Sequence, residues 1–232
     1  MTNELSQKAG IALVLGAVIS IFRVLPIVLS NGVTGDNFPP ESLEEVIFFS
    51  QLQGWHVSHV LILVLIPLLI FGIGILARDA VAKNQASAGI MALIGTTLSM
   101  ILFSVATVLD GFVLPAVTRD IGAAGGAGEA QTGALALFTH EAASIFGGTA
   151  SALLLITALF IGIALMRGFD AQWLGGLGIA LGALSALGYL TGFLNLNISD
   201  GFGRVGPLLM LSFFYLLAVG IAMLRQANPT TT

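Results

Sequence analysis

Six long apolar segments constrain the fold of this chain more than any other feature of its sequence. Each is close to or longer than the roughly 20 residues that an α-helix needs to cross the hydrocarbon core, whereas a membrane strand needs only about 9–11. They are Ala9–Ser30, Leu52–Ala77, Ala88–Val117, Leu137–Met166, Trp173–Leu196 and Val205–Leu224. The sequence therefore predicts a polytopic all-α membrane protein, in which residues 1–232 form one domain of six transmembrane helices.

Composition narrows the functions that such a chain can have. Because 56% of the residues are hydrophobic and only 9% are charged, a lipid bilayer is the expected surrounding. No run of Lys or Arg could neutralise successive phosphates, so binding to nucleic acid is not expected. The chain contains no cysteine, which excludes disulfides, thiolate metal ligands and cysteine nucleophiles. Any metal would have to be held by His, Asp, Glu or Met.

Charged residues in the short loops predict the orientation, because Lys and Arg collect on the cytoplasmic side of a membrane. Five of them fall on the side that holds both termini, and two fall on the other side. The first group is Lys8, Arg78, Lys83, Arg167 and Arg225, and the second is Arg119 and Arg204. We therefore predict a multi-pass protein of the cell (inner) membrane with both termini in the cytoplasm.

Two connecting segments carry their own patterns. After Pro39–Pro40, apolar residues recur at helical spacing and predict a short amphipathic helix on the outer surface; they are Leu43, Val46, Ile47 and Leu52. The segment Ile121–Gly133 is rich in Gly and Ala, which predicts a loop that is mobile unless it dips back against the helices.

Glycine patterns predict how the spans pack. The pairs Gly178/Gly182 and Gly188/Gly192 have the four-residue spacing that lets helix backbones approach closely. They predict a compact bundle, with a homodimer through the same Gly-rich faces as a further expectation. Similar Gly/Ala/Leu runs also relate spans two and three to spans four and five as a parallel repeat: Gly74–Arg78 with Gly89, and Gly162–Arg167 with Gly178.

One stretch resembles a known family. Within Leu159–Leu194, the basic residue Arg167 is followed after a short linker by Trp173-Leu174-Gly175 and a Gly-rich helix. This pattern is similar to the closing helix pair of a bacterial six-span membrane family, domain-of-unknown-function family 4386. It covers about a sixth of the chain. The resemblance implies a fold and implies no activity.

Ionisable groups inside the spans are rare, and each of them needs a partner or a purpose. Counted from the cytoplasmic end of each span at 1.5 Å per residue, Arg23 lies at about 21 Å, His59 at about 27 Å, Asp110 at about 33 Å and His140 at about 39 Å. These groups gather toward the outer leaflet. Their shared depth predicts a polar site that opens to the outer face.

Two histidines and a carboxylate form a nitrogen and oxygen donor set that suits zinc with one position left for water. We therefore predict that His59, Asp110 and His140 hold a divalent metal such as zinc, with Glu141 as the catalytic base. Arg23 would bind an anionic headgroup of the substrate. The chain would then be a metal-assisted hydrolase or transferase that acts on an amphiphilic small molecule.

Two alternatives use the same residues. His59 and His140 could be the axial ligands of haem b in a redox or sensor protein, although their estimated depths differ by about 12 Å. In a non-enzymatic transport or accessory protein, Arg23 would pair with Asp110 and the histidines would satisfy local hydrogen bonds. Trp55 and His56 would then form an interfacial anchor while His59 bonds a neighbouring helix. The sequence leaves open whether the chain is an enzyme.

Overall fold

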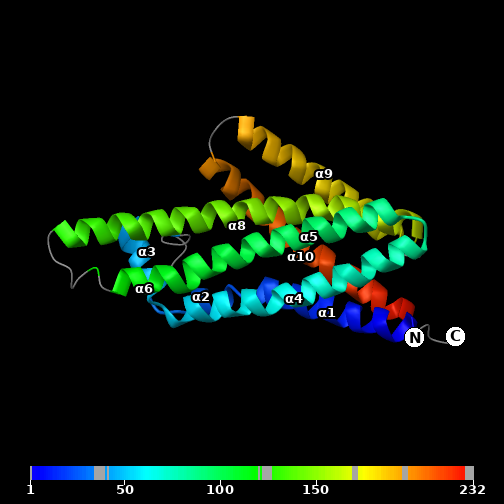
Figure 1. The fold of residues 1–232 in the computed structure, drawn as a ribbon, viewed down its shortest axis with the longest axis horizontal. Helices are drawn as coiled ribbons and strands as arrows, with labels where there is room; N and C mark the ends of the chain where they lie inside the picture. The colour runs from blue at the N-terminus through cyan, green and yellow to red at the C-terminus, as the bar shows by residue number, and fades with distance from the viewer. Residues whose placement is uncertain are drawn as a thin grey trace. The chain divides into compact units, whose positions relative to one another are not determined.

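The computed structural model describes residues 2–33, 40, 42–119, 121, 127–168, 172–194 and 198–227, and their side chains within 4–33, 40, 42–119, 121, 128–166, 172–187 and 209–226. Every regular secondary-structure element among these residues is a helix (Figure 1). The elements are α1 (Thr2–Phe22), α2 (Leu25–Val28), α3 (Leu43–Ser50), α4 (Gln53–Ala82), α5 (Ala86–Val108), the π-helical turn η1 (Leu109–Val113), α6 (Leu114–Arg119), α8 (Ala127–Gly168), α9 (Gln172–Leu194) and α10 (Ile198–Ala227).

Five helical stretches in the described part of the chain are long and apolar enough to cross a membrane. They are Glu4–Val28, Gln53–Ala82, Ala86–Arg119, Gly128–Met166 and Leu209–Gln226. The prediction of an all-helical chain with several membrane-length helices is therefore confirmed. The predicted span Trp173–Leu196 corresponds to α9, of which the shorter apolar stretch Gln172–Leu187 is described. The sixth crossing and the cytoplasmic termini stay predictions.

The short helix predicted after the two prolines is α3. It begins with a capping box, in which the Ser42 side chain accepts from the Glu45 backbone N–H and the Glu45 carboxylate accepts from the Ser42 backbone N–H. Its apolar face is buried, with Val46 packed in a cluster with Leu114, Ile121 and Ala136.

The expected loop over Ile121–Gly133 is wrong in its second half, because α8 already begins at Ala127. Alanine, glutamate and glutamine between residues 127 and 132 favour a helix and outweigh Gly128. The Thr132 hydroxyl also donates to the Gly128 carbonyl oxygen, at 2.8 Å. Residues 122–126 lie outside the described part of the chain.

The chain divides into two compact units. Unit 1 comprises Met1–Ile21, Leu65–Ile101 and Gly148–Thr232, and unit 2 comprises Phe22–Val64 and Leu102–Gly147. Every residue proposed for the polar site belongs to unit 2: Arg23, His59, Asp110, His140 and Glu141.

Glycines bring the helices of unit 1 into close contact. A Cβ atom at Gly178 would overlap the Tyr215 hydroxyl, and one at Gly182 would lie 2.6 Å from the Leu159 backbone nitrogen. The predicted close packing at Gly178 and Gly182 is thus confirmed. The side chains around Gly188 and Gly192 lie outside the described residues, and the homodimer and the parallel repeat stay predictions.

Candidate functional site

The site is organised by a break in the third predicted span, where α5 gives way to η1. The Leu114 backbone N–H donates to the Leu109 carbonyl, five residues back, in place of the Asp110 carbonyl. Pro115 has no N–H with which to bind the Gly111 carbonyl, four residues back. The carbonyl groups of Asp110 and Gly111 therefore lose the donors that a regular α-helix would supply.

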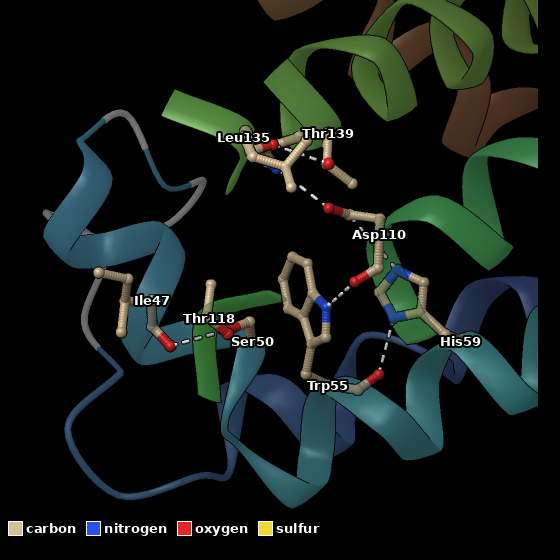
Figure 2. Close-up of polar contacts among 9 residues, drawn as sticks. Ile47, Ser50, Trp55, His59, Asp110, Thr118, Leu135 and Thr139 are labelled. Atoms are coloured by element: carbon tan, nitrogen blue, oxygen red, sulfur yellow. Dashed lines mark hydrogen bonds and ion pairs between the residues drawn. The ribbon is translucent and has the colours of Figure 1, made fainter. Parts of the chain in front are cut away.

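The first turns of α4 supply the missing donors. The Trp55 indole Nε1 donates to the Asp110 carbonyl oxygen at 2.9 Å, and His56 Nδ1 donates to the Gly111 carbonyl oxygen at 3.1 Å. Gly111 allows this approach, because a Cβ atom there would overlap the His59 side chain. The break in the span is therefore stabilised by side chains of α4, as Figure 2 shows for Trp55.

The Asp110 carboxylate lies between two histidines from different helices, of which Figure 2 labels His59. Its Oδ1 is 3.0 Å from Nδ1 of His140 on α8, and its Oδ2 is 3.4 Å from Nε2 of His59 on α4. All three side chains are largely enclosed, with exposed fractions of 18% for Asp110, 9% for His59 and 19% for His140. The structure thus brings together the three residues that the sequence nominates as metal ligands.

The protonation of His59 is constrained by its second nitrogen. Nδ1 of His59 lies 2.7 Å from the Trp55 carbonyl oxygen, and since a carbonyl only accepts, Nδ1 carries a proton. A favourable contact between Nε2 and Asp110 then needs one more proton, either on Nε2 or on the carboxylate. The pair is consequently an imidazolium with a carboxylate or an imidazole with a carboxylic acid.

His59, Asp110 and His140 lie closer in depth than the predicted span ends indicate, because the observed helices end at other residues. Measured from the observed helix ends, His59 lies 23 residues before Ala82, Asp110 lies 24 residues after Ala86, and His140 lies 28 residues before Gly168. At 1.5 Å per residue these are about 35, 36 and 42 Å, a spread of about 7 Å in place of about 12 Å. Side-chain reach accounts for the rest.

The three side chains are not arranged around a shared metal position in the described part of the chain. Among the described residues, no group of three or more His, Asp or Glu side chains is arranged to hold a metal ion. The reason lies at Asp110, because its two carboxylate oxygens contact different histidines. The oxygen and nitrogen atoms therefore contact one another and do not surround a common point where an ion could lie. The haem alternative would have His59 and His140 face one iron, whereas here each of them faces an oxygen of Asp110.

Arg23 and Glu141 do not join this group. Arg23 follows the end of α1, is half-buried, and forms no hydrogen bond or ion pair with any residue that the structure describes. The expected pair between Arg23 and Asp110 is absent, since Asp110 contacts the two histidines. Glu141 is exposed although it follows His140 directly, as expected for neighbours about 100° apart around a helix.

Sequence reasoning missed the residues that support the site. Trp55 is buried among Ile27 and Phe49 and is a hydrogen-bond donor, so its role as an interfacial anchor is wrong. A second polar contact joins α3 to α6, where the Ser50 and Thr118 hydroxyl oxygens lie 2.7 Å apart (Figure 2). The available signal was Pro115, which predicts an unsatisfied carbonyl at Gly111.

Comparisons with known proteins add no relative: no family model, no curated protein and no solved structure matches this chain. The resemblance to domain-of-unknown-function family 4386 therefore stays a prediction. Any functional conclusion has to come from the geometry around Asp110.

Proposed function

We propose that this chain is a proton-coupled membrane protein of the transport class, in which His59, Asp110 and His140 bind and release a proton. One observation carries the proposal. His59 Nδ1 is committed to the Trp55 carbonyl at 2.7 Å, while Nε2 faces Asp110 Oδ2 at 3.4 Å, so the contact between them needs a proton. Chains of Asp and His within membrane helices are typical of proton relays.

The mechanism follows from the two protonation states. With the extra proton present, Nε2 and Oδ2 attract each other and α4 is held against η1. When the proton leaves, a nitrogen lone pair faces a carboxylate oxygen and the two repel. His140 donates to the other oxygen from α8, so a single proton alters the links among three elements. Such a change can couple proton binding to helix movement.

Metal-assisted hydrolysis is the second candidate, because His59, Asp110 and His140 do converge. We rank it lower on one observation, namely that each Asp110 oxygen faces its own histidine. A metal would have to displace both contacts and turn three side chains toward a new point. Binding of a proton between His59 and Asp110 requires no such rearrangement of the side chains.

Proton flux tests the proposal. Purified protein is reconstituted into liposomes that contain a pH-sensitive dye, and the decay of an imposed pH gradient is followed for wild type, Asp110→Asn and Glu141→Gln. We expect faster decay with wild type and Glu141→Gln than with Asp110→Asn, which should match protein-free liposomes. Glu141→Gln is the matched control, because it removes an exposed carboxylate one residue from the site. Equal decay for wild type and Asp110→Asn would disprove the proposal.

Histidine NMR tests the proton itself. In Asp110→Asn the amide nitrogen can donate to His59 Nε2 and the amide oxygen can accept from His140, so no extra proton is needed. The ¹⁵N signals of His59 should then show the neutral Nδ1–H form over the range in which wild-type His59 changes with pH. A wild-type signal that also never changes would contradict the mechanism.

A further inference from the structure

Two faces of α4 are used in unit 2. One carries Trp55 and His59 toward η1. The other is marked by Gly54, where a Cβ atom would overlap the Pro26 carbonyl oxygen and lie 2.5 Å from the Ser30 hydroxyl oxygen. Residues four apart share a helix face, so Ser58 continues the Gly54 face toward the segment that contains Pro26.

The level of Ser58 follows from the direction of the helices. In unit 1, α1 and α4 run antiparallel, because Gly16 contacts Leu69 whereas Gly72 contacts Leu13. With the same order in the segment after α1, moving forward along α4 corresponds to moving back along the earlier chain.

This order leads us to expect Arg23 at about the level of Ser58. The step from Gly54 to Ser58 is about 6 Å along α4, and the step from Pro26 back to Arg23 is about 4.5 Å. The two side chains belong to the same unit.

The side chains of Ser58 and Arg23 both have hydrogen-bond donors that contact no acceptor among the described residues. Ser58 is 1% exposed, and its hydroxyl has no hydrogen-bond partner among the described residues. Several other helical hydroxyls donate to the carbonyl four residues back: Ser20, Thr132, Thr139, Thr157 and Ser185. Arg23 likewise forms no hydrogen bond or ion pair within the described part of the chain. A buried polar group without a partner points to a missing ligand or ion.

We propose that Arg23 and Ser58 form a binding site for the phosphate of an anionic membrane lipid. A guanidinium binds phosphate oxygens through paired, charge-assisted hydrogen bonds, and the Ser58 hydroxyl would be a further donor. Exposed apolar side chains flank Arg23 on its own segment, with exposed fractions of 54% for Phe22, 43% for Leu25 and 77% for Leu29. They would contact the acyl chains of the same lipid. The site is independent of the proton proposal, since neither residue touches Asp110.

Lipid binding to purified protein tests the site. Native mass spectrometry in neutral detergent measures the affinity for phosphatidylglycerol and for zwitterionic phosphatidylcholine. Wild type should prefer phosphatidylglycerol. Arg23→Gln should weaken its binding by about tenfold or more, and Ser58→Ala by about threefold, as expected for a charged and a neutral donor. Arg119→Gln is the matched control, because it removes an exposed positive charge in the same unit and should change nothing.

Three outcomes would overturn the proposal. One is equal affinity of wild type and Arg23→Gln for phosphatidylglycerol, and another is an equal loss in Arg119→Gln, which would indicate general charge attraction. The third is complete displacement of the lipid by excess inorganic phosphate, which would assign a free anion to the site. If Arg23→Gln fails to fold, Ser58→Ala tests the site in its place, because loss of one hydroxyl should leave the fold intact. Wild-type affinity of Ser58→Ala for phosphatidylglycerol would then refute the site.

Discussion

Replacing Gly111 by alanine should destabilise the protein and separate α4 from η1. The added Cβ atom would overlap the His59 side chain, which is packed against the Trp55 ring at a centroid distance of 4.8 Å and cannot move freely. The backbone must therefore shift at the point where Trp55 and His56 bind the carbonyls of Asp110 and Gly111.

The magnitude can be worked out from three contributions. Overpacking costs about 1–3 kcal/mol. Loosening two hydrogen bonds costs about 1 kcal/mol each. Alanine in place of glycine within a helix raises the free energy of unfolding by about 0.5–1 kcal/mol. We expect a net loss of about 3 kcal/mol in the free energy of unfolding, with lower thermal stability to match.

Unfolding by a denaturing detergent, followed by circular dichroism in mixed micelles, measures the loss. Gly176→Ala is the matched control, because a Cβ atom at Gly176 meets nothing within 4 Å, and its stability should equal or slightly exceed that of wild type. If Gly111→Ala unfolds with the wild-type free energy, the His59 side chain of α4 is not in close contact with Gly111 of η1.

Three further predictions concern the same site. Trp55→Phe keeps the ring but leaves the Asp110 carbonyl without its donor, and should lower the free energy of unfolding by about 1–3 kcal/mol in the same assay. Arg23→Ala and Asp110→Ala should have additive effects, with a coupling below about 0.5 kcal/mol in a double-mutant cycle, because the two side chains are not paired. Zinc analysis of purified wild type and of His59→Ala/His140→Ala should give the same low content; a full equivalent of zinc in wild type alone would restore the metal hypothesis.

The sequence predicts the long helices well because their length and apolar character are set by the bilayer. It also nominates His59, Asp110 and His140 correctly as neighbours, since ionisable groups within spans are few and must find partners. The supporting contacts could not be predicted. Whether Trp55 faces lipid, water or η1 depends on how α4 is rotated, and a sequence apolar on every side holds little information about rotation.

The contrast between Asp110 and Arg23 shows a second limit. Their opposite charges alone suggest that Arg23 and Asp110 pair. The packing of η1 instead directs the Asp110 carboxylate to two histidines. Asp110 is placed on a π-helical turn, where its carboxylate meets histidines from α4 and α8. One residue more or less before Pro115 would turn the carboxylate about 100° away.

The break in the third span links the polar site to the backbone. Pro115 and η1 release two carbonyls, and the residues that bind them, Trp55 and His56, stand within one turn of His59. Trp55 takes part twice, since its indole binds the Asp110 carbonyl and its own carbonyl fixes the proton on His59 Nδ1. On the proposed function, a proton gained or lost between His59 and Asp110 would therefore act directly on the contact that stabilises η1. A regular α-helix at this position would satisfy the Asp110 carbonyl through the Leu114 N–H and remove the need for the Trp55 indole.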